Sequence, residues 1–202
     1  KTAIFRYQKE GNVLVVGEGI ASRIQLLLKG STLILGKGRT LRIARKVNLP
    51  KSWKLKIIGE HNRENIACAV AATKALGVAD SVIRRAAEAF RGVPGRLEYL
   101  RTIRGVKIYN DNNATTPNAT VAGLRALREV GSRKYELGIR PKNIILICGG
   151  TDKGLDMFQL IAEIPKHCKA VILLRETGTD KIKERIRNYE LGIMKNLRRN
   201  FS

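Results

Sequence analysis

Apolar residues in the first part of the chain change from strand-like to helix-like spacing and back. Asn12–Gly17 is a short run rich in β-branched residues, and the apolar positions of Glu18–Leu28 recur close to a helical period. Thr32–Leu35 is a second short apolar run. This order predicts a strand–helix–strand unit.

A strand and two helices are expected after Pro50. Trp53–Ile58 has the pattern of a strand, and the two helices are predicted over Asn62–Leu76 and Asp80–Phe90. Asn62 and Asp80 are the expected N-caps, because their side-chain oxygens can accept hydrogen bonds from the first free backbone N–H groups.

Beyond residue 92 the pattern changes to regular alternation. Leu97–Ile103 and Val106–Tyr109 are predicted to pair as a hairpin across Arg104-Gly105. A helix is expected from Pro117, with Thr116 as its cap. Four more elements follow in order: a buried strand, a short helix, a second buried strand and a helix start, over Ile144–Cys148, Met157–Ile164, Ala170–Leu174 and Thr179–Arg187.

Gly92, Pro94 and Gly95 interrupt both patterns, so we place a domain boundary near residue 92. Buried strands that alternate with helices predict an α/β fold with a parallel, doubly wound sheet. Ligands of such sheets bind at the carboxyl ends of the strands. The segments 110–116 and 149–156 each follow a predicted strand, and we expect them at the same edge of one sheet.

Composition makes the chain a folded, strongly basic protein. It has 202 residues and is 44% apolar, which excludes intrinsic disorder, and 39 Lys and Arg against 17 Asp and Glu give a net charge of +22. The positive charge is spread over both halves, with local concentrations only at 39–46 and 181–199. Aromatic residues make up only 5%, so the stacking platforms of single-strand binders are absent and no specific nucleic-acid partner is expected.

The cysteines and apolar runs indicate a cytoplasmic protein. Cys68, Cys148 and Cys168 lie far apart among aliphatic neighbours, which is typical of buried thiols in a reducing compartment. No apolar run approaches the ~20 residues of a membrane span. The chain begins at Lys1, without an initiator methionine, directly before an apolar segment, so we expect it to be a piece of a longer polypeptide.

Two loops carry candidate chemistry in the second domain. In Asn110–Thr116 an acidic residue, short amides and hydroxyls precede a helix N-terminus, where backbone N–H groups favour an anion. The simpler alternative is a capped strand–turn–helix connection. In Gly149–Asp156 two glycines allow a close approach to the backbone, and Lys153 offers a point charge for a carboxylate or phosphate.

Two further segments suit a nucleotide. Asn62 and Asn65 share one face of a helix start, and their amides can both donate to and accept from an adenine edge. The alternative is an ordinary exposed first turn. Arg96, in the Gly92–Glu98 linker, has the reach for a phosphate between two domains or for a salt bridge across the boundary.

Four motifs follow one another along the chain: HNxxN at His61, GxPxR at Gly92, NDxxAT at Asn110 and GGxDKG at Gly149. In this order they resemble the Mur ligase family of ATP-dependent amide-bond-forming enzymes, over about residues 1–187. The first two motifs are shared by much of that family, including the folylpolyglutamate synthases. The last two resemble the branch that adds D-glutamate. The resemblance implies part of a central ATP-binding α/β domain (1–91) and a Rossmann-like, mainly parallel, amino-acid-binding domain (92–202).

The resemblance also implies a nucleotide and metal site. Asn62 and Asn65 would lie against the adenine of ATP, Arg96 would reach its phosphates, and Asp111 would contact the ribose. Lys1 would be the carbamylated lysine that helps to bind Mg2+.

On the substrate side, Thr115 and Lys153 would hold D-glutamate. The implied reaction, a step of peptidoglycan synthesis, transfers a phosphoryl group from ATP to the carboxylate of UDP-N-acetylmuramoyl-L-alanine. The resulting acyl phosphate is attacked by the amine of D-glutamate. A monomer without membrane or nucleic-acid partners is expected.

Three features depart from the family pattern. Leu35–Arg39 contains Gly-Lys but lacks the first glycine and the Ser or Thr of a phosphate-binding loop, so it is predicted to be a turn. Asn113 and Gly95 stand where the family often has lysine and histidine. Without the phosphate-binding loop, the 202 residues alone are expected to be inactive. Two alternatives remain: a ligase like the folylpolyglutamate synthases, and a basic, non-catalytic nucleic-acid-binding module.

Overall fold

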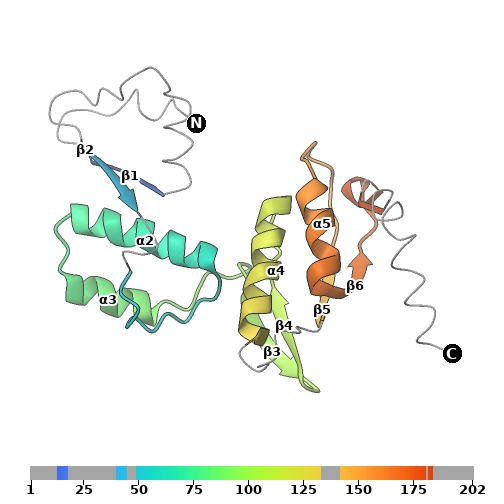
Figure 1. Cartoon of the computed structure of the whole chain (residues 1–202), viewed down its shortest axis with the longest axis horizontal. Coiled ribbons are helices and arrows are strands. Elements are labelled where there is room, and N and C mark those ends of the chain that lie inside the picture. Colours follow the sequence, from blue (N-terminus) through green and yellow to red (C-terminus); the bar gives the residue numbers. More distant parts are fainter. Residues whose placement is uncertain (1–12, 18–39, 45–48, 133–141, 181, 184–202) are drawn as a thin grey trace. The chain divides into compact units, whose positions relative to one another are not determined.

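The computed structural model describes residues 13–17, 40–44, 49–132, 142–180 and 182–183. The chain divides into two compact units, Lys1–Gly92 and Val93–Ser202 (Figure 1). Several predicted features lie outside the described residues: Lys1, the helix at 18–28, the strand at 32–35, the turn at 35–39 and the end of the last helix.

The first unit contains a parallel strand pair. β1 (Val13–Gly17) lies where a strand is predicted, and it pairs with β2 (Thr40–Ala44), with Val13 opposite Thr40. The sequence predicts no strand over this second segment, which lies in a basic stretch. Leu41 and Ile43 alternate there with polar positions, which is a strand pattern that the neighbouring charges obscure.

Two helices follow in the first unit, and both begin slightly differently from the prediction. α2 (Glu60–Ala75) is capped by Gly59 rather than by Asn62, whose side chain instead donates from Nδ2 to the Ile58 carbonyl over 2.8 Å. α3 (Asp80–Ala89) has Ala79 at its N-cap, so Asp80 is its first helical residue and not its cap. Acidic residues in the first turn favour each helix because they face its positive end.

The predicted strand at 53–58 is wrong. The backbone there is irregular, and the Lys54 N–H donates to the Glu88 carboxylate over 3.1 Å instead of to a neighbouring strand. The alternating residues Trp53, Leu55 and Ile57 pack against a buried cluster that α2 supplies in part. Their period of two therefore reflects burial of one side of an extended segment rather than a place in a sheet.

The second unit opens with the predicted hairpin. β3 (Glu98–Ile103) and β4 (Val106–Asn110) pair antiparallel. Arg104 and Gly105 connect them with φ values of 47° and 79°. Left-handed backbone at both turn residues is what a tight two-residue connection requires, and glycine adopts it without a steric penalty.

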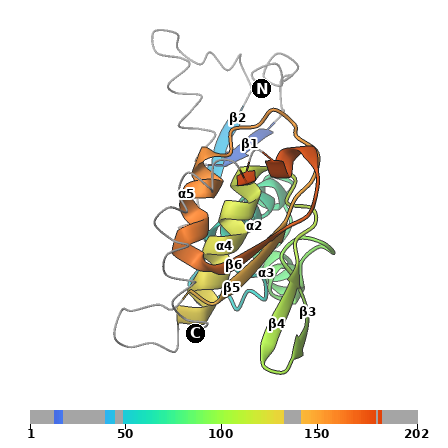
Figure 2. The same cartoon turned by 90° about the vertical axis from the view of Figure 1, so that its right-hand side faces the viewer.

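A helix-covered strand pair completes the second unit. α4 (Pro117–Ser132) and α5 (Phe158–His167) pack on the parallel strands β5 (Ile144–Cys148) and β6 (Cys168–Leu173) (Figures 1 and 2). The last helix is already helical at residue 177, two residues before its predicted start. The buried core comprises Val121, Leu124, Leu160, Ile164 and Cys168.

Two expectations about this sheet need correction. The segments Ile144–Cys148 and Ala170–Leu174 are predicted to be buried strands. Ile145, Ile147 and Ile172 are nevertheless 48%, 61% and 51% exposed, because α4 and α5 cover only the other face in the described part of the chain. A single parallel sheet was expected to carry both candidate loops. Among the described strands, β4 pairs with β3 and β5 pairs with β6, so the two loops follow strands of different sheets.

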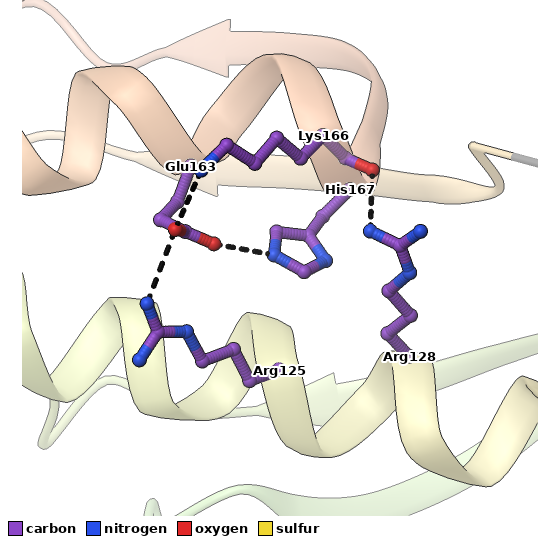
Figure 3. Close-up of polar contacts among 5 residues, drawn as sticks. All are labelled: Arg125, Arg128, Glu163, Lys166 and His167. Carbon is purple, nitrogen blue, oxygen red and sulfur yellow. Dashed lines mark hydrogen bonds and ion pairs between the residues drawn. The ribbon is translucent and has the colours of Figure 1, made fainter.

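An ionic cluster centred on Glu163 joins α4 to α5 (Figure 3). The nearly buried Glu163 carboxylate lies 3.1 Å from Arg125 Nη2, 3.0 Å from Lys166 Nζ and 2.8 Å from His167 Nε2. Arg128 donates to the Lys166 carbonyl over 3.1 Å. Hydrogen bonds from Arg125 and then His167 lower the pKa of Glu163 to about 2, so the carboxylate is ionised at neutral pH.

Candidate functional site

The loop after β4 is fastened to the segment that opens the second unit. Asn113 donates its backbone N–H to the Gly95 carbonyl and its Nδ2 to the Pro94 carbonyl, both over 3.0 Å. The Leu97 N–H donates to Asp111 Oδ1 over 2.8 Å. These bonds join residues up to 19 positions apart, so this contact was not evident from the sequence.

Asp111 therefore has a structural task. One carboxylate oxygen accepts the Leu97 N–H, and the other faces α4 at Gly123, where an added Cβ would lie only 2.9 Å from it. The small residue in α4 makes room for the carboxylate. If Asp111 contacts a ribose as expected, its carboxylate does so while also accepting the hydrogen bond from the Leu97 backbone.

Gly95 is buried at the centre of the same contact. Its φ is +71°, and an added Cβ would lie 2.2 Å from Asn112 Oδ1 and 2.7 Å from Asn113 Nδ2. Its N–H donates to Glu98 Oε2 over 2.8 Å. The positive φ favours glycine here, and a larger residue would have to displace the amides of Asn112 and Asn113. Glu98 is a further site residue, which the sequence pattern does not reveal.

Arg96 and Thr115 are exposed beside this contact. The Arg96 N–H closes a turn onto the Val93 carbonyl over 3.0 Å, and the Thr115 N–H donates to the Asn113 carbonyl over 2.9 Å. Thr116 Oγ1 accepts the Ala119 N–H over 3.3 Å, as the predicted cap of α4 should. The sequence-predicted residues Arg96, Asp111 and Thr115 are therefore brought together at the start of the second unit.

Lys153 lies on the loop after β5, with an exposed side chain. That loop is held by the segment after β6, because the Asp152 N–H donates to Thr177 Oγ1 and the Gly178 N–H donates to the Gly150 carbonyl, each over 2.9 Å. The Gly154 N–H donates back to Asp152 Oδ1 over 2.9 Å. The lysine is thus presented to solvent from a turn with a defined backbone.

The two predicted glycines of this loop have different environments. An added Cβ at Gly149 would lie 2.7 Å from the Leu174 carbonyl oxygen, whereas one at Gly150 would meet nothing within 4 Å. Gly178 approaches the Gly150 carbonyl equally closely, at 2.7 Å from its added Cβ. Gly149 therefore allows the backbone after β6 to approach, rather than another molecule, which corrects our interpretation for that glycine.

The predicted adenine-binding residues lie in the first unit. Asn62 and Asn65 occupy adjacent turns on one face at the start of α2, with Asn65 Nδ2 at 3.5 Å from Asn62 Oδ1. Asn62 is partly buried and Asn65 is exposed. Since Asn62 Nδ2 is held by the Ile58 carbonyl, its amide orientation is set before any ligand arrives.

Metal and thiol chemistry find no support in the described residues. No group of three His, Cys, Asp or Glu side chains lies close enough there to hold a metal ion, and Lys1 is not among these residues. Burial raises the pKa of the Cys68 and Cys148 thiols, and it raises that of Cys168 to about 11. These thiols are therefore protonated at neutral pH, and little of the nucleophilic thiolate is present. No described helix has the length and apolarity to cross a bilayer.

Comparison with known proteins identifies relatives of this chain. The family model described as "Mur ligase, glutamate ligase domain" matches residues 95–198. UDP-N-acetylmuramoylalanine--D-glutamate ligase of Roseiflexus sp. is 41% identical over 129 residues, which are 64% of this chain and 25% of that protein. The protein of the same name from Clostridium kluyveri is 33% identical over 207 residues, covering 95% of this chain and 41% of that protein.

The same fold occurs in a solved structure. UDP-N-acetylmuramoylalanyl-D-glutamyl-2,6-diaminopimelate--D-alanyl-D-alanyl ligase from Acinetobacter baumannii matches with a TM-score of 0.51 and 20% identity, over 86% of this chain and 45% of that one. The chain spans between a quarter and about two fifths of the length of the curated relatives described above. With half of its residues matched by the family model, this α/β chain belongs to the Mur ligase family.

Proposed function

We propose that this chain forms the ATP-side and amino-acid-side contacts of a cytoplasmic ligase that adds D-glutamate to UDP-N-acetylmuramoyl-L-alanine in peptidoglycan synthesis. Residues 1–91 would be the last part of the central ATP-binding domain, and 92–202 the amino-acid-binding domain. The relatives' names support the substrate. The observation that carries the proposal is the joined pair of segments that presents Arg96 and Thr115 beside one helix N-terminus.

The proposed reaction has two steps. The carboxylate of UDP-N-acetylmuramoyl-L-alanine attacks the γ-phosphorus of ATP, and ADP leaves. The amine of D-glutamate then attacks the carbonyl carbon of the acyl phosphate, and inorganic phosphate leaves as the amide forms. Such reactions depend on positioning the reactants and neutralising phosphate charge, because the phosphoryl group itself needs little covalent assistance.

Each side chain has a defined part in this proposal. The exposed guanidinium of Arg96 is suited to pair with phosphate oxygens, and Lys153 to pair with a carboxylate of D-glutamate. The Thr115 hydroxyl would donate to the same substrate at the positive end of α4. Asn62 and Asn65 would line the adenine. Mg2+ would neutralise the ATP phosphates, but Lys1 lies outside the described residues, and we assign no step to the metal.

Titration with D-glutamate tests the amino-acid side directly. Amide NMR spectra of the 202-residue chain should show shifts at Thr115 and around Lys153, and L-glutamate should produce weaker ones. Lys153→Ala should weaken D-glutamate binding at least tenfold, because it removes the only charge assigned to the substrate carboxylate. Lys142→Ala, which removes another exposed lysine of the same unit, is the matched control.

Equal weakening by both lysine variants would show that only the overall positive charge attracts the ligand, and would contradict the assignment of Lys153. Shifts with a folate-type polyglutamate acceptor but not with D-glutamate would favour the folylpolyglutamate synthase alternative. Binding to nucleic acid that falls steeply with salt would favour the basic module. We expect no ATP-dependent phosphate release from these residues alone, since their sequence contains no complete phosphate-binding loop.

A further inference from the structure

We propose that Asn113 is a positioning residue that ties the segment 94–98 to the loop 110–116, so that Arg96 and Thr115 move as one body. We call the hydrogen bonds between residues 94–98 and 110–113 the tie. They form within this chain and involve no ligand. The consequence of the tie for the ligase reaction rests on the function proposed above.

The backbone on both sides of Arg96 is held by hydrogen bonds from the other segment. Before it, the Pro94 and Gly95 carbonyls accept the two bonds from Asn113. After it, the Leu97 N–H donates to Asp111. Arg96 itself is the exposed residue between these anchored positions, so its Cα is fixed while its guanidinium reaches into solvent.

Glu98 adds a second layer to the tie. Its Oε2 accepts the Gly95 N–H over 2.8 Å and lies 3.5 Å from Asn110 Nδ2, at the start of the loop. Both backbone polar groups of Gly95 are thereby bonded, one to Asn113 and one to Glu98. Within the described residues, the segment is therefore joined to the loop at each of the positions 94, 95 and 97.

The tie also links the residue types at positions 95 and 113. A side chain at position 95 would meet the amides of Asn112 and Asn113 at 2.2 and 2.7 Å. An amide at 113 that reaches the Pro94 carbonyl therefore requires glycine at 95. Gly95 and Asn113 are therefore the two sides of one contact.

A fixed spacing between Arg96 and Thr115 would matter for a reaction that joins two substrates. Arg96 is assigned to the phosphate side and Thr115 to the amino-acid side. Holding both on one body removes conformational freedom that would otherwise be lost when the substrates bind. Arg96 and Thr115 would then both be carried by the second unit.

Amide hydrogen exchange in the 202-residue chain tests the tie without any ligand. In Asn113→Ala and in the equally sized Asn113→Asp, which lacks the Nδ2 donor, the Arg96 and Leu97 amides should exchange at least tenfold faster. Asn112→Ala is the matched control, because it removes an exposed amide that also lies against Gly95 but makes no side-chain hydrogen bond to 94–98 in the described structure. Amides of Leu146 and Ile164 report the stability of the unit.

Unchanged exchange at Arg96 and Leu97 would overturn the proposal, as would a uniform acceleration that includes Leu146 and Ile164, since that would reflect overall destabilisation only. D-glutamate binding gives a second readout. Asn113→Ala should weaken it about threefold to tenfold and Asn112→Ala less than twofold, and wild-type affinity in Asn113→Ala would overturn the positioning role. If the wild-type chain does not bind D-glutamate, the proposed function fails while exchange still decides the tie.

Discussion

Glu163 lets us predict how the second unit responds to acid. Hydrogen bonds from Arg125, His167 and Lys166, together with the positive charge of Arg125, lower its pKa from the ordinary 4.5 to about 2. At roughly 1.4 kcal/mol for each tenfold change in proton affinity, that difference corresponds to an upper bound of about 3 kcal/mol. The Arg125 and Lys166 side chains are 51% and 57% exposed, so solvent screening reduces our expected contribution to about 1–2 kcal/mol.

The direction with pH follows from the lowered pKa. The contribution is complete above the unfolded value of about 4.5, and it is lost as the pH falls through the folded value of about 2. Glu163→Gln cannot ionise, so the variant should be less stable at pH 7 by that amount and should lose less stability on acidification. The assay is urea unfolding at a series of pH values from about 6 to about 2, followed by the methyl signals of Ile161 and Ile164 in α5.

Glu176→Gln serves as the control, because it removes an exposed carboxyl of the same unit. It should leave the free energy of unfolding within about 0.5 kcal/mol of wild type, as most surface substitutions do. The reasoning would be refuted if Glu163→Gln and the wild-type chain lost stability in parallel between pH 4.5 and 2. It would also be refuted if Glu163→Gln and Glu176→Gln had the same free energy of unfolding at pH 7.

Two further predictions concern other parts of the second unit. Gly149→Ala should destabilise it by about 1–3 kcal/mol, because the new methyl group meets the Leu174 carbonyl, and Gly150→Ala, with nothing within 4 Å, should cost less; equal urea midpoints would contradict this. Since the pKa of Cys168 is raised to about 11, iodoacetamide should alkylate it at pH 8 at least a hundredfold more slowly in the folded than in the unfolded chain, as followed by mass spectrometry. Comparable rates would show that this thiol is accessible.

Elements with local signals could be predicted from the sequence. The hairpin depends on Arg104-Gly105, and α4 begins where Thr116 and Pro117 indicate, because turn conformation and capping are decided within a few residues. The strand predicted over Trp53–Ile58 was wrong because its pattern is not decided locally. Its alternation comes from packing on a helix that follows it, and no local pattern distinguishes that from pairing with a strand.

The sequence predicts which residues belong to the candidate site, but not the hydrogen bonds that join them. Arg96, Asp111 and Thr115 could be singled out because their motifs are local. The bonds from Asn113 to Pro94 and from Leu97 to Asp111 span 19 and 14 positions. They depend on how β3 and β4 bring the two ends of the hairpin together, which also explains why the sequence alone did not reveal the part played by Glu98.

The close glycine contacts between the loops after β5 and β6 also determine how this unit can be recombined with its relatives. The two loops fit each other closely and have to be exchanged together. They are joined by the contacts of Gly149 with Leu174 and of Gly150 with Gly178, and by the hydrogen bond from Asp152 to Thr177. A chimera that takes only the lysine-bearing loop from another ligase would pair mismatched backbones. Productive crossovers should fall before β5 and after Thr179, so that both loops are exchanged together.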